Sequence, residues 1–347
     1  MSTIPDNARV TTLSIPGTHD SCSIEGPLGF AKTQNLDLAD QLNAGIRFLD
    51  IRLAHYQDNL FAHHNAVHME KSYADILRIC SEFLAKHPTE TVFMSVKEEE
   101  RFDSALGRFA PSEAFGRSRR DPVNWVIRST SFEDAFRART WQHIKDPSLF
   151  YNFPAPLPEG GPVAAGRALT PETTLGEIRG KIVLMRRFEA ARDIGSDFTD
   201  WPKNQHFKSN ESLSYSVEDC YLNPGEENKY DCIVAHIEEA RKGDPKDLYI
   251  TFASAVGMKA ARYSKIINRY LNVYLAGLPR GRIGIIVLDY FELPRKLVSN
   301  VIKINERITD GRPIHKLATE DAPTTSPDRP VSRLGHPDVR GQSGTIE

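Results

Sequence analysis

The sequence is poor in cysteine, in net charge and in long apolar runs, and each shortage excludes a class of protein. Its four cysteines are too few and too scattered for a disulfide scaffold, and none has the spacing of metal ligands. The formal net charge of -2 predicts no strong attraction to nucleic acid. The longest apolar runs, such as Ile283 to Leu288, are far below membrane-spanning length. Any contact with a membrane or a phosphate must therefore come from a local patch.

The two ends of the chain add little to a core. The N-terminus lacks the basic-then-apolar pattern of a secretory signal, so we expect an intracellular protein or one whose signal has been removed. Beyond Asp310 the chain is rich in Pro, Thr, Ser, Asp and Gly and has few large apolar residues, which predicts a disordered polar tail over 311–347. We find no repeat and no interdomain linker before it, so residues 1–310 are expected to form one domain.

The rest of the chain alternates between strand-like and helix-like patterns. Apolar or alternating runs predict strands over 9–15, 46–53, 59–62, 91–96, 181–187, 248–253 and 283–289. Apolar residues at helical spacing predict helices over 35–42, 73–86, 132–144, 230–241, 259–275 and 294–308. We expect a long rim loop over 150–171 and a polar, aromatic segment over 188–228, which lines a polyol site or forms surface loops. Strands separated by helices in this way predict a distorted (β/α)8 TIM barrel with parallel strands and some helices missing.

Charged and polar side chains follow the ends of several predicted strands. In the first, Pro16-Gly17 ends the strand, and His19 and Asp20 come directly after the turn. Because the carboxyl ends of barrel strands form one mouth, we expect seven residues to meet there: His19, Asp20, Arg52, His64, Lys97, Arg187 and Asp289. Asp50 shares a face with Arg52, since strand side chains alternate. The alternative for each residue is a solvated pair or a structural ion pair, and the acidic run 98–100 is typical of a solvated loop.

Two histidines, two carboxylates and an arginine at one mouth suit the cleavage of a phosphodiester. One imidazole can act as base and the other as acid, while the carboxylates orient the rings and tune their pKa values. An arginine between them can hold a phosphate with two hydrogen bonds and neutralise the charge that builds during attack. We find no dense set of carboxylate ligands near Arg52, so we expect no metal ion and no other cofactor.

With these residues in place, the chain resembles the bacterial-type phosphatidylinositol-specific phospholipases C, a family of PLC-like phosphodiesterases with an X-type domain. The similar segments run in order along the chain: Ser14-Ile-Pro-Gly-Thr-His-Asp-Ser21, Thr33-Gln34 with Asp37, Phe48-Leu-Asp-Ile-Arg52, His63-His64, Met94-Ser-Val-Lys97, Lys181-Ile-Val-Leu184 with Arg186-Arg187, Trp201-Pro202, Asp219 with Tyr221, and Asp289-Tyr290. The resemblance implies a distorted TIM barrel that cleaves phosphatidylinositol, or a related glycan anchor, by intramolecular attack.

The resemblance also implies a role for each residue of the mouth. His19 is similar to the general base that takes the proton of the inositol 2-hydroxyl, and Asp289 to the carboxylate that pairs with this base. His64 is similar to the general acid, which protonates the diacylglycerol oxygen with help from Asp20. Arg52 is similar to the residue that binds the phosphate. Calcium-dependent relatives have a metal-ligand carboxylate at that position, so an arginine implies a metal-independent reaction.

In this family the inositol hydroxyls are bound by residues that resemble Lys97, Arg187, Asp219 and Tyr221, with Trp201 near the ring. The implied products are diacylglycerol and inositol 1,2-cyclic phosphate. We therefore expect the partner to be phosphatidylinositol or another inositol phospholipid at a membrane surface. The implied membrane contact is peripheral, and the chain is expected to be a monomer that binds no nucleic acid.

Two other functions fit parts of the pattern. A glycerophosphodiester phosphodiesterase also uses a TIM barrel and two histidines, but it requires a metal cluster of carboxylates. A lipid-binding relative with weak catalysis usually lacks the acid, the base or the arginine, and all five catalytic candidates are present here. We expect His19→Ala and His64→Ala to abolish turnover and to leave the fold intact, because both residues are predicted at a solvent-facing rim.

Overall fold

The computed structural model describes residues 1–25, 31–56, 58–65, 67–99, 130–154, 167–191, 193–210, 213–255 and 260–305. Three predicted segments lie wholly or partly outside the described residues: the tail over 311–347, the centre of the 150–171 loop and the end of the helix expected over 294–308. The division of the chain at residue 310 therefore stays a prediction.

The described strands form one sheet of 11 strands. In chain order they are β1 (Ser14–Thr18), β2 (Phe48–Tyr56), β3 (Asn59–His64), β4 (Val67–Ser72), β5 (Val92–Glu98), β6 (Ile182–Arg187), β7 (Ser196–Asp197), β8 (His206–Asn210), β9 (Ser214–Glu218), β10 (Leu248–Phe252) and β11 (Gly284–Leu288). Their order across the sheet is β7-β6-β5-β2-β1-β11-β10-β9-β8, and the β3–β4 hairpin extends from β2. All pairs from β7 to β9 are parallel, whereas β8, β3 and β4 are antiparallel to their neighbours.

The sheet curls until its two ends approach each other. Phe198, which follows β7, packs against Tyr215 of β9 with ring centroids 4.5 Å apart, although these strands lie near opposite ends of the sheet. Apolar side chains from the strands between them fill the enclosed space, among them Ile15, Phe48, Phe93, Val183, Val217, Ile250 and Ile285. Within the described residues, no hydrogen-bonded ladder joins β7 to β8, so the barrel stays open there. The prediction of a distorted barrel of parallel strands is confirmed.

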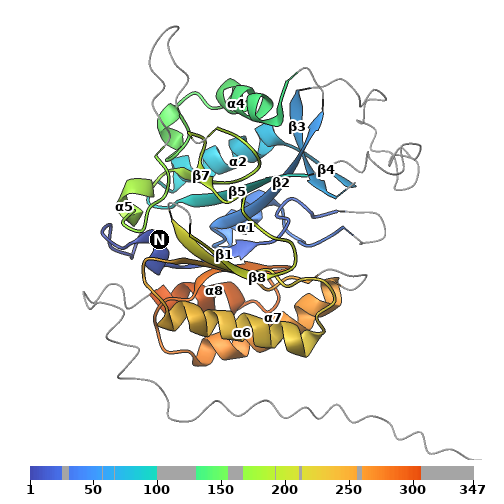
Figure 1. The fold of residues 1–347 in the computed structure, drawn as a ribbon, viewed down its shortest axis with the longest axis vertical. Helices are drawn as coiled ribbons and strands as arrows, with labels where there is room; N and C mark the ends of the chain where they lie inside the picture. The colour runs from blue at the N-terminus through green and yellow to red at the C-terminus, as the bar shows by residue number, and fades with distance from the viewer. Residues whose placement is uncertain are drawn as a thin grey trace, which may run out of the picture.

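Helices cover the outer face of the sheet in two groups (Figure 1). One group consists of α1 (Leu38–Asn43), α2 (Tyr73–Lys86) and α4 (Phe132–His143), and the other of α6 (Glu226–Lys242), α7 (Ala260–Gly277) and α8 (Leu297–Lys303). The remaining short elements are α5 (Leu175–Ile178) and the 3-10 turns η1 (Val10–Thr12) and η3 (Pro147–Leu149). No helix separates β6, β7, β8 and β9 in the described chain, as expected for a barrel with missing helices.

Helix α2 shows how local sequence sets an element of this fold. Ser72 and Asp75 form a capping box at its N-terminus, which satisfies backbone N–H groups that have no partner inside the helix. Its apolar stripe is buried against the sheet and α4, and Pro88 prevents continuation beyond His87. The predicted bounds 73–86 are confirmed.

The prediction for the first strand is wrong at both ends. Residues 10–12 form a 3-10 turn, and β1 then passes through Pro16-Gly17 instead of ending there. Pro16 has no backbone N–H to donate, but its carbonyl still joins the strand pairing by accepting a hydrogen bond from Arg47 N at 2.9 Å. Gly17 is required by close packing, because a Cβ there would lie 2.8 Å from Phe48 Cδ1. Proline and glycine therefore permit a close strand pair here instead of a turn.

Three further sequence predictions differ from the structure. The helix expected over 35–42 begins only at Leu38, where the Asp37 carboxylate caps α1 by accepting from Asp40 N at 2.9 Å. The strand that carries His63 and His64 is antiparallel to β2, so it is not another parallel barrel strand. The segment 188–228 contains β7, β8 and β9, which its polar composition concealed. Long-range pairing decides all these strand positions, and the local pattern of residues does not encode it.

Candidate active site

The first two residues of the mouth are placed by the neighbouring strands β1 and β11. These strands are parallel and in register, with Thr18 opposite Leu288. The next residues, His19 and Asp289, lie side by side, and His19 Nδ1 is 2.8 Å from Asp289 Oδ1. His19 is only 8% exposed, and the Phe252 ring packs edge-on against it. The expectation that His19 sits at a solvent-facing rim is therefore wrong.

Two side chains from the segment after β1 hold the turn that carries His19 and Asp20. Gln34 is fully buried, and its amide donates hydrogen bonds to the carbonyl oxygens of His19 (2.9 Å) and of the last residue of β11 (2.8 Å). Thr33 Oγ1 donates to the carbonyl of Asp20 at 3.0 Å. The φ of Asp20 is 42°, in the left-handed region that costs free energy for any residue except glycine. These hydrogen bonds maintain the strained turn and keep both side chains within reach of Arg52.

Arg52 lies at the centre of the mouth on β2. Its Nε is 2.6 Å from Asp20 Oδ1, its Nη2 is 3.1 Å from Asp50 Oδ2, and its Nη1 is 3.5 Å from Glu99 Oε1. Burial lowers the pKa of the guanidinium, but these carboxylates raise it well above its usual range, so Arg52 is fully charged. For Asp50 the signs are reversed. Burial raises the pKa of its carboxyl, but the positive charges of Arg52 and Arg187 outweigh burial and hold this pKa far below its usual range.

The protonation of His19 is set by two opposing influences. Burial lowers the pKa of the imidazole, but the carboxylates of Asp20 and Asp289 outweigh it and raise the pKa to about 9. Arg52 acts against protonation, since its Nη2 is 2.9 Å from His19 Nε2 and a guanidinium can only donate. This contact requires an unprotonated Nε2, with the ring proton on Nδ1 facing Asp289. The structure therefore shows the neutral form of His19, which is the form that acts as a base; with a pKa of about 9, this form is in the minority at pH 7 and predominates above pH 9.

His64 contacts the carboxylate of Asp20, which His19 also contacts. It ends β3, and the antiparallel pairing of β3 with β2 brings it back over the mouth. Its Nδ1 is 2.8 Å from the carbonyl oxygen of Ala31 and 3.3 Å from Asp20 Oδ2. The hydrogen bond to a carbonyl fixes a proton on Nδ1, which leaves Nε2 as the nitrogen that can exchange a proton with a ligand. Asp20 therefore lies between two imidazoles, because its Oδ2 is also 3.4 Å from His19 Nε2.

Beside Arg52, three neighbouring strands present a row of cations. The parallel register places Arg52 opposite Lys97 of β5, and Lys97 opposite Arg187 of β6, so the three side chains share one face. Asp50 Oδ1 is 3.5 Å from Arg187 Nη1, and Glu99 Oε2 is 3.4 Å from Lys97 Nζ. Burial lowers the pKa of both Lys97 and Arg187. The row is a strip of three cations, interleaved with the carboxylates of Asp20, Asp50 and Glu99.

An aromatic residue extends this strip towards β9. The guanidinium of Arg187 lies over the Trp201 ring, 3.8 Å from its centroid, and Trp201 Nε1 donates to Asp219 Oδ2 at 3.0 Å. Tyr221 is tied to this side by its backbone N–H, which donates to Asn204 at 2.8 Å. Burial, and next the Asp219 carboxylate, raise the pKa of the Tyr221 hydroxyl. The predicted residues of the 188–228 segment thus line one side of the mouth.

Two residues of the mouth were not predicted as site residues. The sequence analysis placed Asp50 on the same strand face as Arg52 but did not assign it to the site. Its position two residues before Arg52 was the signal that could have identified it. Glu99 was expected in a solvated loop, and that expectation is wrong because only 6% of it is exposed. Its backbone N–H continues the pairing of β5 with a hydrogen bond to Leu53 O at 2.9 Å. No local pattern distinguishes Glu99 from the other acids of its run.

A cation could be held by His19, Asp20 and Asp50, whose ligand atoms lie within 4.8 Å of one another. Arg52 already lies among them: it contacts Asp20 at 2.6 Å and Asp50 at 3.1 Å, and it donates to His19. A divalent ion at the same place would be repelled by this guanidinium and would have to displace it. The three residues therefore fit a guanidinium better than a resident metal ion.

The chain is similar in sequence to known proteins over most of its length. Residues 7–110 match the family model described as PI-PLC X 1. The 1-phosphatidylinositol phosphodiesterase of Listeria monocytogenes is 26% identical over 318 residues, which cover 88% of this chain and 84% of that protein. The protein of the same name from Staphylococcus aureus strain Newman is 27% identical over 309 residues, covering 84% of this chain and 87% of the relative. The similarity therefore extends well beyond the segment matched by the family model.

Solved structures show the same fold. The phosphatidylinositol-specific phospholipase C of L. monocytogenes has a TM-score of 0.62 at 26% identity, covering 88% of this chain and 97% of that chain. A structure of the S. aureus enzyme has a TM-score of 0.70 at 24% identity, covering 88% and 96%. In the described part of this chain, no helix is both long and apolar enough to cross a bilayer. Residues 7–110 are similar to the PI-PLC X family model, and over most of its length the chain is similar in sequence and fold to the bacterial phosphatidylinositol-specific phospholipases C.

Proposed function

We propose that this chain is a phosphatidylinositol-specific phospholipase C, which cleaves the phosphodiester of phosphatidylinositol into diacylglycerol and inositol 1,2-cyclic phosphate. The observation that carries the proposal is the arrangement around Asp20. His19, His64 and Arg52 all lie within 3.4 Å of its carboxylate, so a base, an acid and a phosphate ligand can act on one substrate group.

In this mechanism His19 is the general base for the inositol 2-hydroxyl. Asp289 engages Nδ1 at 2.8 Å, so Nε2 is the nitrogen that accepts the proton. In the ligand-free site Nε2 accepts from Arg52. A substrate phosphate offers Arg52 a stronger, charged acceptor, and Nε2 is then released to the hydroxyl. The carboxylates of Asp289 and Asp20 stabilise the imidazolium that forms as the hydroxyl attacks phosphorus.

His64 is the general acid in the second half of the reaction. Its Nδ1–H is held by a backbone carbonyl, so Nε2 delivers the proton to the leaving diacylglycerol oxygen. Asp20 Oδ2, 3.3 Å from the same Nδ1, helps to hold the ring in this orientation. The mechanism requires the two histidines to begin in opposite protonation states, with His19 neutral and His64 carrying the proton that it donates.

Arg52 binds the phosphate oxygens and neutralises the charge that develops in the transition state. The adjacent cations Lys97 and Arg187, together with Asp219 and Tyr221, provide donors and acceptors for the inositol hydroxyls. Trp201, which packs against Arg187, Phe207 and Phe252, is the aromatic residue that we place beside the inositol ring. All these groups belong to one chain, so a single copy supplies the whole site, and we propose a monomer that acts on the lipid at a membrane surface.

A metal-dependent glycerophosphodiester phosphodiesterase is the second candidate, favoured only by the grouping of His19, Asp20 and Asp50. The two functions make opposite predictions about metal removal. In the phospholipase, the positive charge at the phosphate comes from Arg52, so cleavage needs no divalent ion. In the alternative enzyme, a metal ion activates the attacking water, and chelation abolishes activity.

The deciding experiment follows phosphorus-31 NMR spectra during incubation of the wild-type chain with phosphatidylinositol vesicles in excess EDTA. We expect the resonance of inositol 1,2-cyclic phosphate to appear, and no product from phosphatidylcholine vesicles, because that headgroup lacks an attacking hydroxyl. His19→Gln serves as the negative control. Cleavage only after metal addition, or of glycerophosphodiesters in preference to phosphatidylinositol, would reject the proposal. A parallel assay on a glycan-anchored protein distinguishes the free lipid from the anchor.

A further inference from the structure

A second group of histidine and carboxylate side chains lies on the outer face of the barrel, away from the mouth. On β9 the side chains of Tyr215 and Val217 point into the barrel core, so Ser216 between them points outward. Around this serine, the structure brings together His206 of β8 and His236 of α6. None of these residues belongs to the proposed catalytic machinery.

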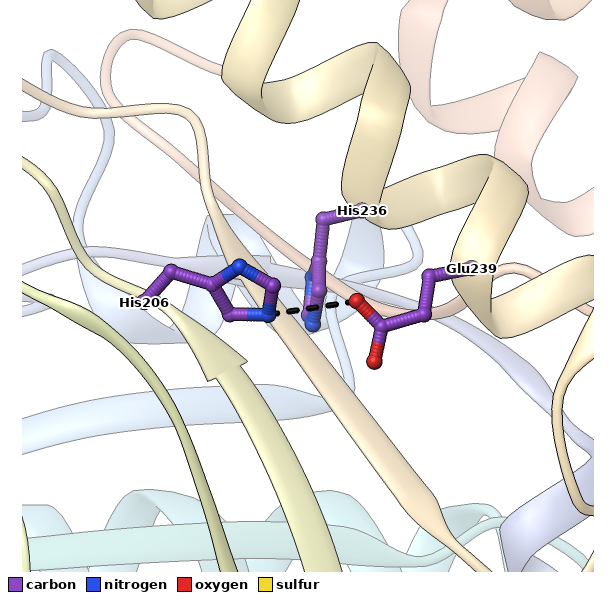
Figure 2. A group of neighbouring side chains, drawn as sticks. All are labelled: His206, His236 and Glu239. Carbon is purple, nitrogen blue, oxygen red and sulfur yellow. Dashed lines mark ion pairs between the residues drawn. The ribbon is translucent and has the colours of Figure 1, made fainter.

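The three potential ligands converge from two elements (Figure 2). His236 and Glu239 are three residues apart on α6 and so share one helix face, which lies over β8 and β9. His206 Nε2 is 3.2 Å from Glu239 Oε2, and the ligand atoms of all three residues lie within 4.8 Å of one another. Ligands bound to a tetrahedral zinc ion at about 2.0–2.1 Å are roughly 3.3 Å apart, so only small movements would complete such a site.

The surroundings orient the rings for metal binding. His236 is 1% exposed, and its Nδ1 is 2.8 Å from Thr251 Oγ1 on β10. With that nitrogen engaged, Nε2 is directed at the cluster, as in histidine ligands whose second nitrogen is held by an outer partner. Lys208, the nearest basic residue along β8, is paired with Asp247 at 2.6 Å and does not occupy the site.

We propose that His206, His236 and Glu239 form a zinc-binding site. Two imidazoles and one carboxylate are a ligand set that zinc prefers to magnesium or calcium, and a water completes the tetrahedron. Ser216 Oγ now lies 3.1 Å from His236 Nε2, 3.3 Å from His206 Nε2 and 3.0 Å from Glu239 Oε1. Zinc would take over both imidazole nitrogens from this hydroxyl and leave Ser216 hydrogen-bonded to Glu239. The site ties β8, the antiparallel edge strand, to α6 at the open side of the barrel. This inference is independent of the catalytic proposal.

The test is a zinc titration of the tag-free full chain by isothermal calorimetry, with thermal unfolding as the second readout. We expect one zinc ion per chain and a higher unfolding temperature at saturation, because a ligand that binds only the folded state stabilises it. His206→Ala and Glu239→Gln change groups at least partly exposed to solvent and should fold, and each should abolish the high-affinity binding. Thr251→Val should weaken it by about 10- to 100-fold through the outer shell. His143→Ala, at the exposed end of α4, is the matched control.

X-ray absorption at the zinc edge identifies the ligands directly. We expect two imidazole nitrogens and one carboxylate oxygen at about 2.0–2.2 Å. His19→Gln should retain the same spectrum, since the mouth is a separate cluster. The proposal is overturned if zinc does not bind, if magnesium competes equally, or if His206→Ala and Glu239→Gln bind zinc as the wild type does. Loss of binding in His19→Gln alone would place the ion at the mouth instead.

Discussion

Two groups of buried charged residues in this molecule differ in how many of their polar atoms make hydrogen bonds. Under α6, Lys229 Nζ lies 2.9 Å from both carboxylate oxygens of Glu218, and Glu218 also accepts from Cys220 N at 3.1 Å. Lys229 and Glu218 are at most 1% exposed. The mouth, by contrast, contains charged atoms that make no hydrogen bond within the described structure: both oxygens of Asp20 and Nε of Arg187. These atoms are held only by neighbouring charges.

The difference separates a structural pair from a site prepared for a ligand. A buried polar group without a hydrogen bond costs free energy, and a fold retains it where something else is gained. The mouth is also open to solvent at its cations, since the side chains of Arg52 and Lys97 are 16% and 30% exposed. A phosphate can therefore reach the cations, and nothing can reach Lys229. Changes at the mouth should alter catalysis, whereas changes at the closed pair should alter stability.

The largest effect is expected for Arg52→Lys. Lysine keeps the charge but not the planar fork that holds two phosphate oxygens, so we expect kcat/KM on phosphatidylinositol to fall by about 10³- to 10⁵-fold. This corresponds to roughly 4–7 kcal/mol of transition-state stabilisation. Cyclic inositol phosphate release measures the rate, and urea unfolding should change by no more than about 1 kcal/mol. A variant with near wild-type rates would show that Arg52 does not act on the phosphate.

His64→Gln should reduce kcat by about 10²- to 10⁴-fold on the natural lipid, because the diacylglycerol oxygen then leaves without a proton. A synthetic inositol phosphate ester with a p-nitrophenol leaving group does not need that proton. We therefore expect the loss to be much smaller on this substrate, measured by the release of p-nitrophenolate. An equal loss on both substrates would assign His64 a role other than general acid.

At the closed pair, Lys229→Met should destabilise the fold by about 3–5 kcal/mol, because it leaves the Glu218 carboxylate buried without a cation. The activity of the remaining folded protein should be unchanged. Burial raises the pKa of Glu218, and removal of Lys229 raises it further, so protonation at lower pH should reduce the cost. Unfolding at pH 7 and pH 5 measures this. A pH-independent cost would point to lost packing instead of a buried charge.

A smaller change is expected in the pH profile of Asp289→Asn. The Asp289 carboxylate helps to raise the pKa of His19 to about 9, and its loss should move that pKa down towards the ordinary value. A base works only when unprotonated, so the acid limb of kcat/KM should shift to lower pH by at least one pH unit, while the maximum falls. Rates from pH 5 to pH 10 for wild type and variant provide the check. An unshifted limb would mean that His19 does not set it.

Much of the architecture could be predicted from local sequence. The helical spacing of apolar residues over 73–86 identified α2, because burial of one helix face leaves a repeating pattern. The continuous apolar run before Asp289 identified β11, because this strand is buried on both faces. The polar residues after the parallel strands also indicated one mouth, since all such strands end at the same side. The segment that contains β8 and β9 was missed, because its strands alternate with polar residues and pair over long distances.

The sequence by itself determined which side chains can act as an acid, a base or a phosphate ligand, and at which strands they lie. Only the tertiary structure decided which charges are buried together: Glu99 beside Arg52, His64 folded back by an antiparallel hairpin, and His206 under α6. The physical reason is that periodicity is a property of neighbouring residues. Pairing and burial depend on distances between segments as far apart in sequence as His19 and Asp289.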